Sequence, residues 1–229
     1  ATTNNEFDAA ANYLLQKGME KLILDLRGNG GGYLSSAIIM CNEFLYKNKL
    51  ILFTRGDKRE RTDYFSSYDG KLRDIDLAIL INQSSASSSE IFAGCMQDHD
   101  RATIIGKRSF GKGLVQEQIK LPDGSAIYLT TQRYYTPSGR CIQKPYEYNH
   151  KEYDLESLSR NHNEKSVYSD SLIYQTMGGR AVYGGGGITP DSLISSDTTL
   201  NYIKTNYLIM NNWTQEFALM YQNKLQSIV

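Results

Sequence analysis

Apolar residues recur in two rhythms along the first half of the chain, and these rhythms predict its helices and strands. A spacing of three to four residues predicts helices, whereas short continuous apolar runs between turn residues predict buried strands. The predicted helices are residues 6–18, 35–48 and 87–100, and the predicted strands are residues 21–27, 50–56, 76–82 and 102–106. The resulting order, α-β-α-β-β-α-β, is the signature of a layered α/β domain.

Residues at the ends of these elements refine their limits. Gly18 is a plausible C-cap for the first helix, and Ser35 or Ser36 is a natural N-cap for the second. Residues 57–75 are polar, and we expect them to form an exposed hairpin or loop.

The second half of the chain has a different pattern. Residues 114–121 and 125–135 are typical of strands and flank Pro-Asp-Gly, which predicts a hairpin turn. Residues 141–178 form a long polar stretch, which we interpret as a surface insertion. Residues 197–227 predict two amphipathic helices, separated by Asn-Asn-Trp-Thr.

Composition narrows the function classes. The 229 residues include 25 Lys and Arg against 25 Asp and Glu, so the net charge is zero and nucleic acid is not expected as the main partner. No apolar run reaches the length of a transmembrane helix. The three cysteines are too few and too scattered for a disulfide framework or a metal cluster, and Cys41 and Cys95 fit buried positions in helices.

A run of serines is the first candidate for chemistry. Five serines occupy positions 84–89, interrupted by Ala86, between a predicted buried strand and a predicted helix. Ser87 and Glu90 have the spacing of a capping box, which makes Ser87 the N-cap. A hydroxyl there lies at the positive end of the helix dipole, and the next N–H, of Ser88, is available to an oxyanion. Ser87 is thus a candidate nucleophile, although it could equally be only a cap.

A serine nucleophile needs a base, and the histidines are poorly placed for that role. His99 and Asp98 are about 18 Å and about 16 Å along the predicted helix from Ser87. Lys112 lies between two glycines just before a strand, where desolvation could make it a general base. Gln116 follows four residues later and could orient its amine. Lys107 is a competing candidate, and Lys112 could also be an ordinary surface lysine.

Two glycine-rich segments approach nucleotide-binding motifs without completing them. Residues 106–113 match a P-loop except that Gly113 stands where Ser or Thr should bind magnesium, and a strand follows instead of a helix. Residues 27–33 suggest a dinucleotide fingerprint, but its third glycine is replaced by Tyr33. No nucleotide is therefore expected. The glycines at the strand end have another use, because the N–H of Gly31 or Gly32 could be a second oxyanion donor, although they could also simply form a tight turn.

Together these segments resemble one protein family. The chain is similar to the carboxy-terminal processing (tail-specific) proteases, which are serine-lysine peptidases of the S41 type. The similarity lies in residues 22–32, 84–116, 121–140 and 184–191, in the order in which the family has them.

The resemblance implies an α/β fold: a crotonase-like layered core with an added β-hairpin region and C-terminal helices. Residues 1–229 would be the catalytic core, without the PDZ domain that family members usually carry before it, so we expect a fragment of a longer protein. The family's nucleophile falls on Ser87, its lysine base on Lys112 and its lysine-orienting glutamine on Gln116. Its oxyanion donors fall on Gly31 and Ser88. The aspartate that some accounts place in a relay falls on Asp98, which we interpret as structural.

The expected function is that of a serine endopeptidase that cleaves polypeptides near their free C-termini, without a cofactor or a metal. Its expected location is the bacterial cell envelope, either periplasmic or lipid-anchored. The alternative is a catalytically silent member of the same fold that binds peptides as a scaffold.

Overall fold

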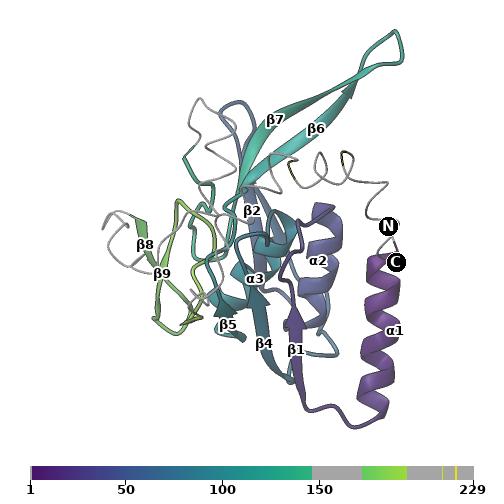
Figure 1. Cartoon of the computed structure of the whole chain (residues 1–229), viewed down its shortest axis with the longest axis vertical. Helices are drawn as coiled ribbons and strands as arrows, with labels where there is room; N and C mark the ends of the chain where they lie inside the picture. The colour runs from purple at the N-terminus through teal and green to yellow at the C-terminus, as the bar shows by residue number, and fades with distance from the viewer. Residues whose placement is uncertain (1, 146–171, 195–212, 214–219, 221–229) are drawn as a thin grey trace.

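The computed structural model describes residues 2–145, 172–194, 213 and 220 (Figure 1). Its helices are α1 (Thr3–Gln16), α2 (Leu34–Glu43) and α3 (Ser88–Asp98). Its strands are β1 (Lys21–Asp25), β2 (Leu50–Arg55), β3 (Thr62–Phe65), β4 (Asp76–Ile81), β5 (Ala102–Gly106), β6 (Leu114–Lys120), β7 (Ala126–Tyr135), β8 (Ile173–Gln175), β9 (Ala181–Tyr183) and β10 (Ser192–Leu193).

The strands of the described ranges form two four-stranded sheets and one short pair. The first sheet has the order β1-β4-β5-β10, and all of its neighbours are parallel. The second has the order β3-β2-β7-β6, and all of its neighbours are antiparallel. Strands β8 and β9 pair separately. Long crossovers therefore join the strands of the first sheet, and helices α2 and α3 lie in these connections.

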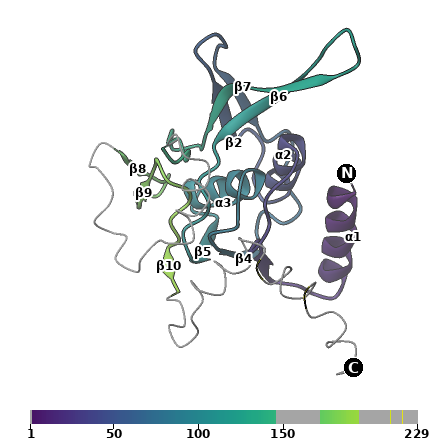
Figure 2. The same ribbon diagram turned by 45° about the horizontal axis from the view of Figure 1, so that its top comes forward.

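Helices α2 and α3 lie between the two sheets (Figure 2). Helix α3 contacts β5 of the parallel sheet and β2 of the antiparallel sheet, and α2 packs against both α3 and β2. Helix α1 flanks α2, where the rings of Phe7 and Phe44 are 5.9 Å apart. The fold is thus a layered α/β arrangement, in which both faces of α3 are covered.

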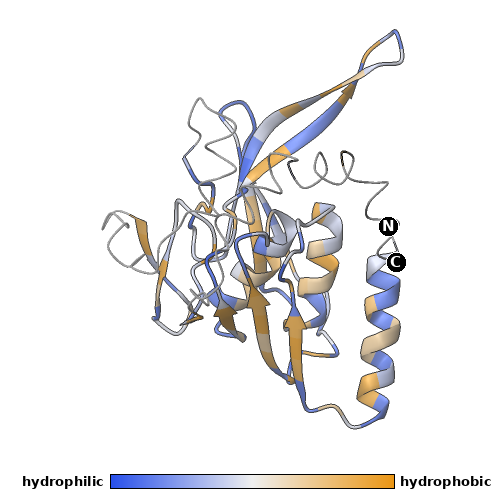
Figure 3. Cartoon of the chain, viewed as in Figure 1, coloured by the Kyte–Doolittle hydropathy of each residue, from blue (hydrophilic) through white to orange (hydrophobic). Residues whose placement is uncertain are grey.

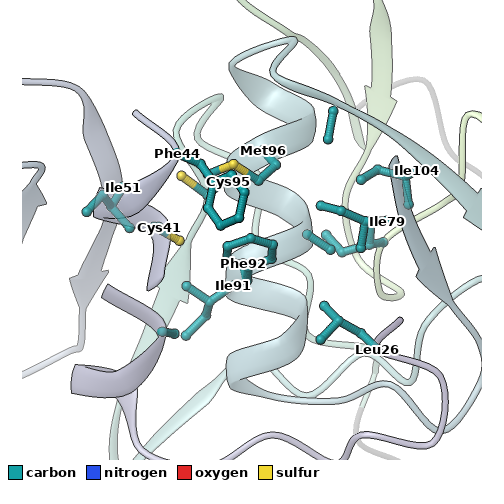
Figure 4. Close-up of a cluster of buried hydrophobic side chains, with 14 of the residues drawn as sticks. Leu26, Cys41, Phe44, Ile51, Ile79, Ile91, Phe92, Cys95, Met96 and Ile104 are labelled. Atoms are coloured by element: carbon teal, nitrogen blue, oxygen red, sulfur yellow. The ribbon is translucent and has the colours of Figure 1, made fainter. Parts of the chain in front are cut away.

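The core surrounds α3 (Figure 4). Phe92 packs edge-on against Phe44, with ring centroids 5.4 Å apart, and Ile79 and Ile104 are fully buried beneath the helix. Cys41 and Cys95 lie in the same cluster with no exposed surface, so the prediction of buried thiols is confirmed. Strands β1 and β4 are mainly orange, the colour of hydrophobic residues, in Figure 3, which agrees with the continuous apolar runs that predicted these strands.

The limits of the second helix differ from those predicted. Its N-cap is Tyr33, so the prediction of Ser35 or Ser36 is wrong. Leu34 packs against the core, and this contact extends the helix beyond the serines, whose capping preference is weaker than the burial of an apolar side chain. The helix ends at Glu43, because the fully buried Phe44 turns the chain into the core.

The polar segment 57–75 is only partly exposed. Strand β3 pairs with β2 as a hairpin, as the sequence suggested. Beyond it, however, Ser66 and Leu72 are buried. The Ser66 hydroxyl donates to the carbonyl of Tyr46, which ties this segment to the end of α2.

Two further predictions fall largely outside the described residues. Most of the predicted tail helices, within residues 197–227, cannot be compared, nor can residues 146–171 of the proposed insertion. At the described start of that segment, Ile142 is fully buried, and Lys144 is 4% exposed. The extent of the insertion therefore stays a prediction.

Candidate active site

The glycine-rich loop and the serine run meet at one edge of the parallel sheet. Strands β1 and β4 are parallel neighbours, with Asp25 opposite Leu80, so both end at the same edge. Residues 26–33 leave the end of β1, and residues 82–87 leave the end of β4. Such an edge, at the carboxyl ends of parallel strands, is where ligands bind in α/β proteins.

Two side chains fasten these loops together. Asn82 Oδ1 accepts the N–H of Gly28 at 2.9 Å, and the hydroxyl of Ser85 donates to the carbonyl of Leu26 at 2.7 Å. Ser85 has no exposed surface and also accepts the N–H of Asn82. Ser84, in contrast, is exposed. Ser85 is therefore a structural residue of this turn.

Ser87 has an unusual backbone conformation. Its φ is 57° and its ψ is −118°, directly between a strand and a helix. Two other non-glycine residues of the described chain have positive φ, and they are Asn48 and Asp100, types that tolerate it. The conformation of Ser87 lies in a region that costs about 1–3 kcal/mol and is found at functional sites. A strained strand-to-helix turn also exposes the nucleophilic serine of α/β-hydrolases.

The first turn of α3 begins at this serine, as the capping box predicts. Ser87 is the N-cap, and the carboxylate of Glu90 accepts the N–H of Ser87 at 2.8 Å. The N–H of Ser88 has no hydrogen-bond partner within the described part of the chain. The hydroxyl of Ser89 donates to Asn29 Oδ1 at 2.9 Å and is structural. Ser87 and Ser88 are both half-buried, but of the five serines only Ser87 has the strained backbone conformation.

Gly31 lies against this turn. A Cβ atom on it would be 2.5 Å from the carbonyl oxygen of Ala86 and 2.7 Å from the nitrogen of Ser88, and its φ is +88°. Only glycine fits here. The structure thus brings Gly31 next to Ser87 and Ser88, but the N–H of Gly31 donates to Asn29 Oδ1 at 2.9 Å. In this state, the predicted oxyanion donor is already paired.

Glu90 gathers hydrogen bonds from two separate segments. Its Oε2 accepts the N–H groups of Ser87 at 2.8 Å and of Lys112 at 2.9 Å. Its Oε1 accepts the hydroxyl of Ser109 at 2.5 Å and the N–H of Gly111 at 2.7 Å. The side chain is 1% exposed. The turn that carries Ser87 and the loop that carries Lys112 are therefore held by the same carboxylate.

The environment of this carboxylate changes its acidity. Burial is the largest influence and raises the pKa of Glu90 to about 7, while its four hydrogen bonds act in the opposite direction. Desolvation of this kind disfavours the charged form of a carboxyl group. A buried, strongly shifted carboxyl beside candidate catalytic residues is itself an indication of a functional site.

Lys112 lies on the same side of the fold as Ser87. The hydroxyl of Tyr134 is 2.5 Å from the carbonyl oxygen of Lys112 and 3.1 Å from that of Ser87. The N–H of Gly113 is fixed by Gln143 Oε1 at 2.8 Å. Among the described residues, no hydrogen bond joins the Lys112 amine to the Ser87 hydroxyl. Their backbones thus share hydrogen-bond partners, whereas no hydrogen bond joins their side chains in this structure.

Gln116 is not joined to Lys112 by a hydrogen bond in the described structure. Lys112 precedes β6, and the register of β6 against β7 shifts between Val115 and Gln116. The extra residue, Thr131, lies on β7, and Lys112 itself lies outside β6, so the strand alternation behind the predicted same-face arrangement does not extend to the lysine. The side chain of Gln116 is exposed, so its orienting role stays a prediction.

The far end of α3 is structural, as expected for Asp98. Asp98 Oδ1 forms an ion pair with Arg140 at 2.7 Å, and its Oδ2 accepts the N–H of Ser138 at 2.9 Å. Neither side chain of the ion pair is exposed. The ring of His99 is bound to the carbonyl of Leu50, and burial lowers the pKa of this histidine.

Sequence reasoning missed three residues that build the site. Asn29 and Asn82 lie in loops rich in turn residues, and Tyr134 lies in a strand rich in aromatic residues. Each acts through contacts with residues that are far away in the sequence. Glu90 was identified as a capping residue, but its bonds to the lysine loop have no local signal.

The described residues contain no cluster of three His, Cys, Asp or Glu side chains arranged to bind a metal ion. None of their helices combines the length and apolar character that a bilayer crossing requires.

Comparison with known proteins gives consistent matches. The family model of peptidase family S41 matches residues 1–150. A carboxy-terminal-processing protease of Bartonella bacilliformis is 51% identical over 122 residues, which are 53% of this chain and 28% of the relative. A probable CtpA-like serine protease of Staphylococcus saprophyticus is 35% identical over 142 residues, which are 62% of this chain and 29% of that protein. The chain thus spans less than a third of the length of these relatives.

A solved structure matches over a larger part of the chain. The photosystem II D1 C-terminal processing protease superposes with a TM-score of 0.62 and 25% sequence identity. The match covers 85% of this chain and 40% of that protein.

Proposed function

Because the chain belongs to peptidase family S41, we propose that it is the catalytic core of a serine endopeptidase that cleaves polypeptides near their free C-termini. The main observation in support is the conformation of Ser87, a strained, half-buried serine at a strand-to-helix turn. The parallel sheet and the helices that cover it are consistent with a crotonase-like core.

In this proposal, Ser87 is the nucleophile and Lys112 is the base. The neutral Lys112 amine takes the hydroxyl proton as Ser87 Oγ bonds to the peptide carbonyl carbon, and the same proton then passes to the leaving amine. Water, deprotonated by Lys112, next releases the acyl group from Ser87. The shared contacts of Glu90 and Tyr134 with both backbones support this pairing. Gln116 would orient the amine once the side chains meet.

The oxyanion would be held by the N–H groups of Ser88 and Gly31. The Ser88 N–H is at the N-terminus of α3, where the helix dipole favours negative charge. The Gly31 N–H is bonded to Asn29 Oδ1, so the developing oxyanion would replace this side chain as its acceptor. The proposal requires no metal and no cofactor.

The substrate class and location follow from the relatives. The Bartonella bacilliformis relative and the solved structure are named as processing proteases for C-termini, which supports polypeptides with free C-termini as substrates. We further propose that the protein acts in the bacterial cell envelope, either periplasmic or lipid-anchored, because carboxy-terminal processing proteases are commonly associated with the envelope.

Cleavage of an unstructured peptide with an apolar free C-terminus, followed by intact-mass analysis, tests the proposal. The full-length protein is compared with its Ser87→Ala and Ser84→Ala variants. Ser84 is the matched control because it is exposed, whereas the Ser85 hydroxyl is part of the fold. We expect wild type and Ser84→Ala to cleave and Ser87→Ala to be inactive. Cleavage by Ser87→Ala would remove Ser87 from the mechanism, and peptide binding without cleavage by wild type would favour a scaffold.

A further inference from the structure

A single oxygen atom connects the backbones of the two residues of the proposed dyad. Oε2 of Glu90 accepts the N–H of Ser87 at 2.8 Å and the N–H of Lys112 at 2.9 Å. The two nitrogen atoms must therefore lie within two hydrogen-bond lengths of each other. Twenty-five positions separate these residues in the sequence, so the connection is tertiary.

The carboxylate that makes this connection is itself fixed. Its other oxygen, Oε1, accepts the hydroxyl of Ser109 and the N–H of Gly111. The Ser109 hydroxyl in turn accepts the N–H of Ile188 at 2.6 Å. Rotation of the carboxylate would break bonds on both oxygens, which are buried and without access to replacement water.

The lysine loop depends on such an anchor. Lys112 is flanked by glycines, and Gly111 has a φ of +93°. Glycine allows this conformation but has more conformational freedom than other residues, so the loop is not rigid by itself. Proton transfer between a serine and its base requires the two groups to be placed within a fraction of an ångström.

We propose that Glu90 is a positioning residue for catalysis, and that its Oε2 sets the separation of Ser87 and Lys112. This inference rests on the proposed function, because it assumes that these two residues form the dyad. The role goes beyond that of a capping residue. In a capping box, the glutamate binds the N-cap N–H, whereas Glu90 also binds three donors of the segment 109–112.

Glu90→Ala and Gln97→Ala form a matched pair of variants to test this role. Both remove a buried, hydrogen-bonded side chain of similar size from α3, but Gln97 bonds to Thr189, Asp191 and Arg140, far from Ser87. Peptide cleavage by the full-length protein is measured as kcat per folded molecule and as KM, with the folded fraction taken from circular dichroism.

We expect Glu90→Ala to lower kcat by about 100-fold while KM changes by less than about 3-fold, because a misplaced base slows chemistry more than binding. Gln97→Ala should lower the unfolding midpoint but leave kcat per folded molecule within about 3-fold of wild type. Glu90→Gln should have a kcat at least about 10-fold higher than that of Glu90→Ala. Its amide oxygen can still accept the N–H groups of Ser87 and Lys112 and its nitrogen can donate to the Ser109 hydroxyl, whereas the N–H of Gly111 loses its acceptor.

If Glu90→Ala does not fold, the kcat values of Glu90→Gln and Glu90→Asp are compared instead to test the positioning role. Aspartate keeps the charge but is one methylene shorter, so we expect its kcat to be at least about 10-fold lower than that of glutamine. Equal kcat values for these two variants, or a kcat for Glu90→Ala within about 3-fold of wild type, would overturn the inference. If Ser87→Ala is inactive but Glu90→Ala keeps a kcat within about 3-fold of wild type, this inference alone is overturned. A wild type without cleavage overturns the proposed function and this inference with it.

Discussion

Helix α3 carries a buried carboxylate at each end, and the two have different partners. Asp98, in the last turn, is paired with the guanidinium of Arg140, and both are completely buried. Glu90, in the first turn, is 1% exposed, and its four hydrogen-bond donors are a hydroxyl and three backbone N–H groups, all neutral. Asp98 is thus buried beside a counter-charge, whereas Glu90 is buried among hydrogen-bond donors that carry no net charge.

This difference distinguishes the end of the helix that an ion pair stabilises from the end that carries the proposed active site. A buried ion pair needs its partner to be stable, and its contribution is to hold α3 to the segment that contains Arg140. Burial without a counter-charge raises the pKa of Glu90 to about 7, and the hydrogen bonds from neutral donors oppose this shift only in part. A buried carboxyl with a shifted pKa is typical of functional sites.

The largest effect is expected at the ion-paired end. Arg140→Leu leaves Asp98 buried without its counter-charge, so the free energy of unfolding should fall by about 3–5 kcal/mol. Chemical denaturation measures this change, and the double variant with Asp98→Asn should recover part of it. A loss below about 1 kcal/mol would mean that Asp98 does not depend on Arg140.

A backbone change at the other end should have the next largest effect. Gly31→Ala places a methyl group within 2.7 Å of Ser88 N and requires a left-handed conformation, so we expect a loss of about 3 kcal/mol and loss of cleavage. The matched control is Gly30→Ala, where a Cβ meets nothing within 4 Å. Denaturation and peptide cleavage, measured on both variants, check the result. Equal losses would show that close packing against Ser88 is not the cause.

The pH dependence of stability should reveal the carboxylate that lacks a counter-charge. Folded Glu90 keeps its proton up to about pH 7, whereas in the unfolded chain its carboxyl group loses the proton near its ordinary pKa of 4.5. Its contribution to stability is therefore present below pH 4.5 and is lost as the pH rises through 7. The glutamine of Glu90→Gln does not titrate. Relative to this variant, the free energy of unfolding of wild type should fall by on the order of 2 to 3 kcal/mol between pH 4.5 and pH 8.

Denaturation of both proteins at these two pH values measures the difference. A gap between wild type and Glu90→Gln that stays constant with pH would show that the folded carboxyl has an ordinary acidity. In that case, the four donors would outweigh the burial.

The sequence was sufficient to identify Ser87 as the N-cap of α3, because the capping box is a local pattern and the strand before it is a continuous apolar run. The environment of the lysine was not predictable in the same way. Lys112 lies just outside β6, so strand alternation does not relate its side chain to that of Gln116, and the register shift at Thr131 of β7 has no reliable local signal. The second role of Glu90 depends on residues 109–112, which only the tertiary fold brings to it.

The start of α2 illustrates the same limit. Two serines predicted a cap there, but packing of Leu34 set the helix start at Tyr33 instead. The residues alone predicted Gly31 or Gly32 as an oxyanion donor, and the structure shows how these two glycines differ, because a Cβ atom would collide with its surroundings at Gly31 but not at Gly32. Local patterns thus identify candidate residues, while packing decides which of them act.

The backbone of Ser87 has a consequence for how this protein can evolve. A glycine at this position would adopt the same φ of 57° without a Cβ atom to strain it, and would leave the turn relaxed. Selection for thermal stability alone would therefore tend to remove the hydroxyl. If Ser87 is the nucleophile as proposed, its retention in a lineage would reflect selection for chemistry over a relaxed turn.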